Sequence, residues 1–507
     1  MKKELNSSAT RTADQNTEIN SEIFNPFELL HANTTLEIAI YKDLKAFQAK
    51  YSIINRSGKT YVCWKDREQD VLEFQNIPDF HTFHAHKFHY LPAKGKAEPK
   101  KVLISKLFIE SKDTTRYEGI IFDPSPSANI SNKYWNLWSG FKVTPKQGDI
   151  TPLNQLIAAL CSDDADCAEY MMNYLAHMVQ KPWELPETAV VMRGPQGIGK
   201  GTLMKTLSLI TENYKHLSSG ASLTGTFNGH LLDSYIIFCD EAIWGGDKSS
   251  EGTLKAMITE PYVMINDKNR TAIQVRNYKR LFVASNEDWV IPVGEGDRRF
   301  FVVDCDARYK GQTEPGQFFS TYNQWLTSGG IEALMFELTS RDISEFNPRN
   351  FPVTHARVDL MIRSLSPTNK FIIDLLEKNI NLESGTEVTL NATGSIRWYR
   401  NRLYQDYLNW CDSQKIRFPS SLTDFGKTIS LAFGFEKQDN GNWRVNWKHK
   451  TLGYYYQLNC RKEGMKRFAE LLLNVPPELV FFGYNEESDH VVEVDENDVV
   501  VSLFKQA

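Results

Sequence analysis

The stretch Ala189-Val190-Val191-Met192, followed by Gly194-Pro195-Gln196-Gly197-Ile198-Gly199-Lys200-Gly201-Thr202, decides the fold of this 507-residue chain. The first part is an apolar run typical of a buried strand, and Leu203 to Leu207 continues it as a helical pattern. A glycine-rich turn between a strand and a helix lets backbone N–H groups close around an anion, because no side chains intervene and the helix N-terminus carries partial positive charge. We therefore expect this turn to bind phosphate.

The spacing of Gly194, Gly199 and Lys200 is that of a P-loop, in which the lysine neutralises the β- and γ-phosphates of a nucleotide. The next residue is usually Ser or Thr, which holds Mg²⁺, but here it is Gly201. Either Thr202 or water would have to take that role. The motif predicts ATP and Mg²⁺ as cofactors, with Thr202 as a candidate metal ligand.

A second apolar run, 234–239, ends in Asp240 and Glu241, which is typical of a buried parallel strand. Asp240 would hold Mg²⁺, directly or through water, and Glu241 would polarise the attacking water. An ordinary strand with an acidic turn is the alternative. A third run, 280–285, ends in Asn286, at the sheet edge where α/β proteins bind ligands. Asn286 could sense the γ-phosphate or orient the water.

Two arginines, Arg298 and Arg299, follow before the apolar run that begins at Phe300. An arginine that enters a nucleotide site from a neighbouring subunit stabilises the charge that develops during phosphoryl transfer. Arg299 is the preferred candidate because it directly precedes Phe300, and Arg298 is the second. A surface turn with two solvated arginines is the alternative.

These motifs, in this order, resemble the ATPase core of superfamily-three helicases. Segments 227–231, 240–248, 254–261 and 285–292 are similar to the helicase half of primase-helicases from phages, prophages and large DNA viruses. The resemblance covers roughly residues 115 to 330. It implies an α/β fold with an AAA+ type P-loop core, a helical collar near 169–180 that helps subunits associate, and a hexamer that moves 3′ to 5′ along DNA.

Residues 261–275 are typical of a β-hairpin with a polar, basic tip. In a ring of subunits such tips would project into the pore, where Lys268 and Arg270 could contact DNA phosphates. The resemblance favours Lys268 as the main contact, and a solvated hairpin is the alternative.

Composition limits the partners and the compartment. The formal net charge of -5 excludes global attraction to nucleic acid, so any DNA site must be local. The chain has no run of 18 apolar residues and no apolar N-terminal segment, which predicts no membrane span and no secretion signal. The 7 cysteines are scattered without C-x-x-C pairs, so they suit a reducing host cytoplasm and give no zinc or disulfide framework.

Composition shifts and proline clusters predict the domains. We expect a disordered segment (1–22), a small α+β accessory domain (23–150), the ATPase domain with its collar (151–340), a linker (341–367), a basic domain (368–469) and an acidic tail (470–507).

The basic domain has a net charge opposite in sign to that of the whole chain. Residues 391–467 contain 14 Lys and Arg against 6 Asp and Glu, a local net charge of +8. Two helical patterns and a hairpin pattern resemble the winged-helix domain that ends viral and phage primase-helicases. DNA backbone contact is expected, with protein docking as the alternative. From Glu470 onward, 9 acidic residues oppose only Lys505, so the tail should avoid DNA.

Four histidines, His81, His84, His86 and His89, form a separate group. Alternation in a strand would put His84 and His86 on one face, where imidazoles can bind Zn²⁺ or Cu²⁺. No nearby Cys or carboxylate completes a ligand set, so a partly exposed strand or loop is favoured.

The combined prediction is an ATP-driven hexameric DNA helicase that serves the replication of a phage, prophage or mobile element, with a separate primase as a further partner. Three alternatives remain: a non-unwinding, DNA-binding initiator ATPase, a small-molecule kinase, and a purely structural DNA-binding protein.

Overall fold

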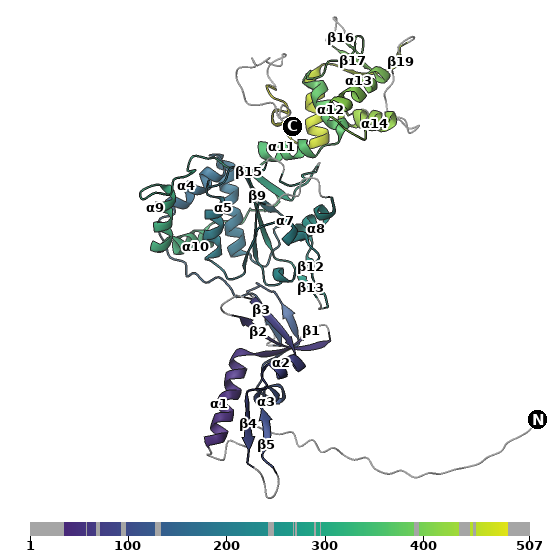
Figure 1. Cartoon of the computed structure of the whole chain (residues 1–507). Helices are drawn as coiled ribbons and strands as arrows, with labels where there is room; N and C mark the ends of the chain where they lie inside the picture. The colour runs from purple at the N-terminus through teal and green to yellow at the C-terminus, as the bar shows by residue number, and fades with distance from the viewer. Residues whose placement is uncertain are drawn as a thin grey trace, which may run out of the picture. The chain divides into compact units, whose positions relative to one another are not determined.

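The computed structural model describes residues 35–484, except 57, 67–70, 93–97, 127–132, 242–247, 267, 269–270, 288–289, 295, 390–394, 435–446 and 450–452. The expected disordered segment 1–22 and Arg270 lie outside these residues. The chain divides into two compact units, one of residues 1–120 with 130–135 and one of 121–129 with 136–507. Figure 1 labels the elements. No helix in the described part of the chain is long and apolar enough to cross a membrane.

The first unit is an α+β structure. Its elements are α1 (Thr35–Lys50), β1 (Ser52–Arg56), β2 (Lys59–Asp66), β3 (Val71–Asn76), α2 (Ile77–Phe83), β4 (Phe88–Leu91), β5 (Lys100–Leu103), α3 (Ile104–Glu110) and β6 (Arg116–Tyr117). The sheet order is β3-β2-β1-β6, and β4 pairs with β5 in a separate antiparallel hairpin. Ile40, Leu44 and Phe47 recur at helical spacing, so α1 buries them against Phe80 and Phe108.

The second unit is built on a five-stranded parallel sheet. Its strands are β9 (Ala189–Arg193), β10 (Tyr214–Leu217), β11 (Ile236–Asp240), β14 (Arg280–Ser285) and β15 (Phe300–Asp304), in the order β10-β11-β14-β9-β15. Every neighbouring pair is parallel. The three apolar runs expected as strands are β9, β11 and β14, and this prediction is confirmed. A mixed α/β fold with a parallel sheet is therefore present.

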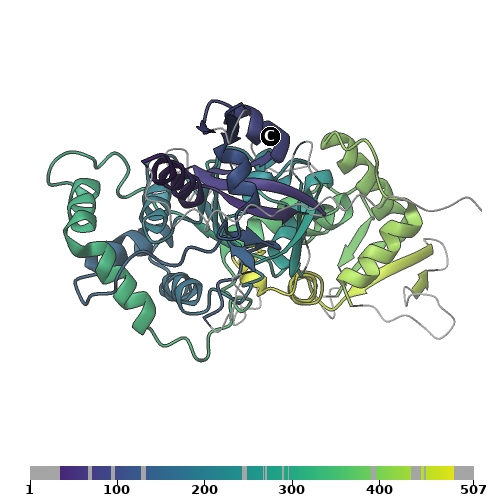
Figure 2. The same ribbon diagram turned by 90° about the horizontal axis from the view of Figure 1, so that it is seen from below.

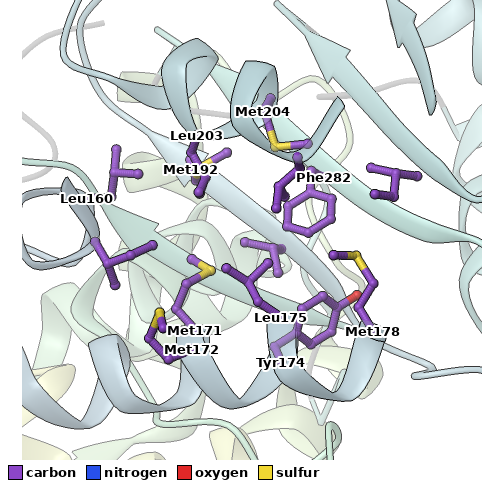
Figure 3. Close-up of a cluster of buried hydrophobic side chains, with 14 of the residues drawn as sticks. Leu160, Met171, Met172, Tyr174, Leu175, Met178, Met192, Leu203, Met204 and Phe282 are labelled. Carbon is purple, nitrogen blue, oxygen red and sulfur yellow. The ribbon is translucent and has the colours of Figure 1, made fainter. Parts of the chain in front are cut away.

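Helices cover both faces of this sheet. They are α4 (Thr151–Leu160), α5 (Ala165–Gln180), α6 (Lys200–Ser208), α7 (Gly220–Thr224), α8 (Lys248–Thr259), α9 (Phe318–Trp325), the π-helical turn η3 (Leu326–Gly330) and α10 (Ile331–Ser340). Figures 1 and 2 show α4, α5, α9 and α10 grouped on one side. Between the layers, α5 contributes Met171, Leu175 and Met178 to a core with Met192 and Phe282 (Figure 3). The helix expected as an intersubunit collar thus packs against its own sheet.

The short strands β7 (Gly119–Ile121) and β8 (Tyr134–Asn136) form a separate two-stranded sheet. The second unit also contains the 3₁₀ turn η2 (Gly229–Leu231), β12 (Tyr262–Ile265) and β13 (Ile273–Arg276). β12 and β13 pair antiparallel in register, Tyr262 with Arg276 and Ile265 with Ile273, which confirms the expected hairpin.

The C-terminal part contains α11 (His355–Ser364), α12 (Pro367–Leu376), β16 (Glu387–Thr389), β17 (Ile396–Tyr399), α13 (Arg400–Ser413), α14 (Leu422–Ala432), β18 (Trp447–His449), β19 (Gly453–Leu458), α15 (Arg461–Arg467), η4 (Phe468–Leu473) and η5 (Pro477–Leu479). The strands form one antiparallel sheet in the order β16-β17-β19-β18.

Two expectations about this part differ from the structure. The stretch 341–367, expected to be a linker, contains α11, because Thr354 accepts a hydrogen bond from the Arg357 N–H and so caps the helix. The start of the expected acidic tail is also folded, since Leu473, Val475 and Phe481 are buried. Apolar residues among the acidic ones explain this order.

Candidate nucleotide site

The glycine-rich turn joins the carboxyl end of β9 to α6. Gly194, Gly197 and Gly199 all adopt positive φ values, of 147°, 81° and 113°. Gly199 is the N-cap of α6, and a Cβ there would lie 2.6 Å from Leu156 Cδ1. Residues that carry a side chain rarely adopt such backbone angles, so this turn needs glycine at these positions. Gly201 differs, because it has open space around it.

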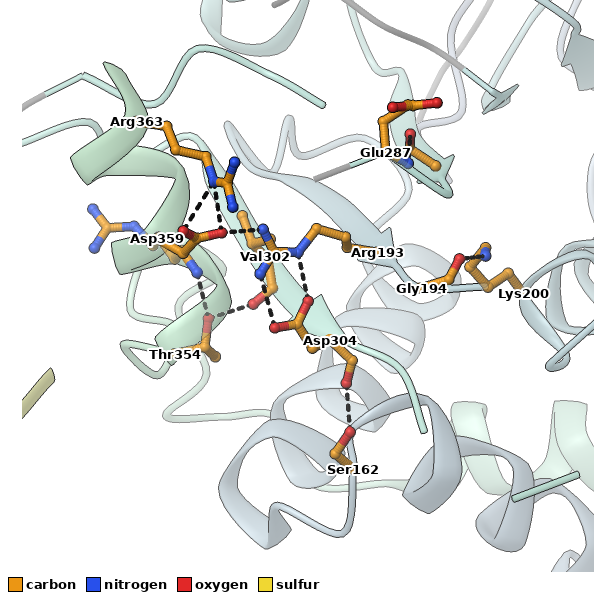
Figure 4. Close-up of polar contacts among 12 residues, drawn as sticks. Ser162, Arg193, Gly194, Lys200, Glu287, Val302, Asp304, Thr354, Asp359 and Arg363 are labelled. Carbon is orange, nitrogen blue, oxygen red and sulfur yellow. Dashed lines mark hydrogen bonds and ion pairs between the residues drawn. The ribbon is translucent and has the colours of Figure 1, made fainter. Parts of the chain in front are cut away.

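Lys200 folds back over the turn that precedes it. Its side chain is buried, and Nζ donates hydrogen bonds to the carbonyl oxygens of Gly194 and Pro195, the latter at 2.8 Å (Figure 4 draws the first). Nζ also donates to Asn286 Oδ1 at 3.3 Å. Burial lowers the pKa of Lys200 from its usual value, although the charge of Asp240 opposes the shift. Lys200 and Asn286, two of the expected site residues, are therefore in contact.

The end of β14 is also hydrogen-bonded to the turn. The Gly194 N–H donates to the Ser285 carbonyl oxygen at 3.1 Å. Ser285 Oγ accepts from the Glu287 N–H at 3.0 Å, and Asn286 between them is exposed. The carboxyl ends of β9 and β14 thus present a backbone turn, an ammonium and an amide at one edge of the sheet, as expected for parallel strands.

Asp240 ends β11, the strand on the other side of β14. Its carboxylate is half exposed and lies 3.8 Å from His216 Nε2 on β10. Glu241 is exposed with φ of 53°, a left-handed conformation that costs a non-glycine residue roughly 1–2 kcal/mol. The residues that follow, 242–247, lie outside the described part of the chain. Among the described residues there is no group of three or more His, Cys, Asp or Glu that could hold a metal ion.

The two arginines expected near the nucleotide have different surroundings. Arg299 donates from one terminal nitrogen to both carboxylate oxygens of Asp297, each at 3.3 Å, within its own chain. Asp297 is buried, and its carboxylate also lies 3.5 Å from Lys255 Nζ. Arg298 is exposed. Because Arg299 is engaged by Asp297, Arg298 is the better candidate for reaching another molecule, which reverses the expected preference.

The hairpin residues expected to contact DNA lie at the turn between β12 and β13. Lys268 is exposed there, whereas Arg270 is outside the described residues. The roles expected for the site residues, among them Thr202, Asp240, Glu241, Asn286 and Lys268, stay predictions.

One polar network near the turn was missed by the sequence analysis (Figure 4). Arg193, which directly precedes Gly194, donates to both carboxylate oxygens of Asp304 on β15, at 2.6 and 2.9 Å, and to Asp359 on α11. Burial alone would lower the pKa of Arg193, but the hydrogen bonds to Asp304 and Asp359 raise it above its usual value. No local pattern marks these residues, because they come together only through the tertiary structure.

The comparisons with known proteins give a family match and a sequence relative. Residues 192–299, which include the turn, match a family of unknown function, DUF5906. The chain is 31% identical over 189 residues to a DNA primase-polymerase of Nitratiruptor phage NrS-1. That match covers 36% of this chain, and the chain spans about a quarter (26%) of the length of that relative.

Two solved structures share the fold. An apo structure of the NrS-1 C-terminal region has a TM-score of 0.57 at 17% identity, covering 83% of this chain and 99% of that chain. A second apo structure, the A form of the same region, has a TM-score of 0.56 at 17% identity, with 82% and 98% covered. At this identity the likeness concerns the fold alone.

The comparisons correct one prediction. The expectation that this chain is an ATP hydrolase and superfamily-three DNA helicase is wrong, because the relative found by sequence bears the name of a different enzyme, a DNA primase-polymerase. The physical reason is that a strand, a glycine turn and a lysine indicate phosphate binding. Many reactions share that property, so the motif does not determine which reaction follows.

Proposed function

We propose that this chain is a nucleotide-binding component of phage-type DNA replication, which holds a nucleoside triphosphate at Gly194 to Thr202. The observation that carries the proposal is the convergence of the positive-φ glycine turn, the buried Lys200 ammonium and Asn286 at one sheet edge. Backbone N–H groups and a lysine are the donors that bind phosphate in such turns. ATP is the nucleotide we propose, in an AAA+ type arrangement of the sheet.

Mg²⁺ would accompany the triphosphate. This ion keeps several waters and needs only one or two protein carboxylates beside the phosphates. Asp240 offers a half-exposed carboxylate whose charge acts on Lys200, so the residues present fit such an ion. Asp240 and Thr202 are the ligands that we propose.

DNA is the proposed macromolecular partner. The name of the sequence relative, a phage DNA primase-polymerase, supports a place in phage DNA replication. The exposed Lys268 and the net charge of +8 over 391–467, in a domain that we propose to be of winged-helix type, support local contacts to phosphates. In a homo-oligomer, Arg298 is the residue that we propose to reach a neighbouring subunit.

Binding of a fluorescent ATP analogue in the presence of Mg²⁺ tests the nucleotide site. Lys200→Ala should weaken binding by about 10- to 100-fold, because a charge-assisted hydrogen bond contributes roughly 1.5–3 kcal/mol. Gly199→Ala should also weaken it, since the new side chain meets Leu156 and a left-handed backbone.

Gly252→Ala is the matched control for these variants. Gly252 lies on α8 in open space, so the substitution should leave the affinity unchanged. If Lys200→Ala bound the analogue as tightly as the Gly252→Ala variant, the proposed site would be refuted.

A further inference from the structure

The β4–β5 hairpin of the first unit has two different faces. Strand alternation directs His89 and Leu91 inward, where both are partly buried and His89 Nε2 lies 2.8 Å from the Asp43 carboxylate on α1. Phe88 and Tyr90 lie on the opposite face, with exposed fractions of 36% and 55%. An aromatic pair is thus held on the surface by a hairpin whose other face is anchored to α1.

A lysine completes this outer face. Lys101 is paired with Tyr90 across the hairpin, and its Nζ lies 4.1 Å from the centre of the Phe88 ring. The Phe88 and Tyr90 ring centres are 5.4 Å apart at an interplanar angle of 79°. The outer face therefore combines two aromatic rings with a cation at short range.

The surrounding sequence is strongly basic. Residues 87–101 contain five lysines, at 87, 94, 96, 100 and 101, against the single acidic residue Glu98, a local net charge of +4 in a chain of net charge -5. Lys87, Lys100 and Lys101 are exposed in the structure. This local positive charge attracts a polyanion.

The histidines of this segment have structural roles. His81 Nδ1 lies 2.9 Å from Ser105 Oγ, His84 is buried among aromatic rings, and His89 meets Asp43. These contacts hold the hairpin and its preceding helix α2 in place within the first unit. The anchoring keeps the outer face in position.

We propose that the outer face of the β4–β5 hairpin, formed by Phe88, Tyr90 and Lys101, binds single-stranded DNA. Unpaired bases can stack on exposed aromatic rings regardless of sequence, while lysines contact the backbone phosphates. Duplex DNA keeps its bases stacked on each other and would use only the charges. This site lies in a different unit from the nucleotide turn and does not depend on nucleotide binding.

DNA binding at this face can be tested directly by photo-cross-linking the full chain to a short oligothymidine that carries 5-iododeoxyuridine. The expected cross-linked peptide contains Phe88 or Tyr90. Tyr90→Leu should lower its yield and weaken binding to labelled oligothymidine by about tenfold, since stacking contributes roughly 1–3 kcal/mol per base. Lys101→Gln should reduce the slope of log affinity against log salt by about 0.7.

Tyr41→Leu provides the matched control. Tyr41 is also exposed, at 45%, and Lys45 Nζ lies 5.4 Å from its ring centre, but Lys45 pairs with Asp113 at 3.7 Å. This variant should bind and cross-link as the unmodified chain does. The proposal is overturned if cross-links fall only outside 87–101, if Tyr90→Leu behaves as Tyr41→Leu does, or if duplex DNA of the same sequence competes equally. Lys200→Ala should leave the cross-link intact, which separates this inference from the nucleotide site.

Discussion

His177 illustrates how burial changes the chemistry of a single residue. It lies on α5 with 2% of its surface exposed, and its Nε2 is 3.3 Å from Glu184 Oε2. Burial, assisted by the charges of Arg280 and Lys181, lowers its pKa to about 3. The ring is therefore neutral at ordinary pH, and its contact with Glu184 is a hydrogen bond and not an ion pair.

This pKa leads to a prediction about acid stability. An unfolded histidine titrates near pH 6.5 and takes up a proton that the folded ring rejects until about pH 3. The free energy of unfolding should therefore fall as pH drops below about 6.5, by up to about 1.4 kcal/mol per pH unit from this group. Urea denaturation at several pH values between about 7 and 5 measures it.

The variant His177→Gln should flatten that dependence, whatever its effect on stability at neutral pH. His86→Gln, at an exposed position, serves as the control and should keep the original slope. Equal slopes for both variants would contradict the assignment.

At the scale of elements, the Arg193 network joins three pieces of the second unit. Arg193 ends β9, Asp304 ends β15, and Asp359 lies on α11. Two further hydrogen bonds hold α11: the Thr354 hydroxyl donates to the Val302 carbonyl, and Arg357 donates to the Asp297 carbonyl at 2.6 Å. Helix α11 is thereby tied to the strand beside the glycine turn. A segment with several prolines around it is ordered by these contacts.

Arg193→Met should destabilise the second unit, because it leaves the nearly buried Asp359 carboxylate with only Arg363 as a charged partner in this network. Loss of one partner of a buried ion pair costs roughly 3–5 kcal/mol, and the partial exposure of Arg193 reduces this estimate. Thermal denaturation should show a drop of several degrees.

Arg308→Met is the matched control, because Arg308 also binds two carboxylates, Asp163 and Asp306, but at the surface. Its effect should stay within about 0.5 kcal/mol. A similar loss of stability in both variants would show that burial of the Arg193 network does not contribute to stability.

At the scale of the whole molecule, the chain consists of two compact units with separate cores. Units with independent cores unfold in separate transitions when few contacts join them. A ligand stabilises only the unit that binds it, by about 2.7 kcal/mol at a hundredfold excess over Kd.

Differential scanning calorimetry should accordingly show two unfolding transitions. Addition of Mg²⁺ and ATP should raise the midpoint temperature of only one of them. Lys200→Ala should abolish that shift. A single transition, or an equal shift of both, would contradict the independence of the two units.

The sequence alone predicted much of the second unit. Apolar runs at 189–192, 234–239 and 280–285 identified β9, β11 and β14, since strands buried on both faces need continuous apolar residues. The glycines around Lys200 identified the turn, because positive φ values strongly favour glycine. The reaction could not be predicted in this way, because phosphate binding is common to many enzymes.

Local sequence thus determined the central strands and the glycine turn, because periodicity and backbone preference act over a few residues. The tertiary structure alone decided which side chains meet. Strand β14 lies between β11 and β9, so Asn286 reaches Lys200 across 86 residues, and Arg193 reaches Asp359 across 166. It also buried Asp297 and exposed one aromatic face of the β4–β5 hairpin, because burial depends on neighbours that are distant in the chain.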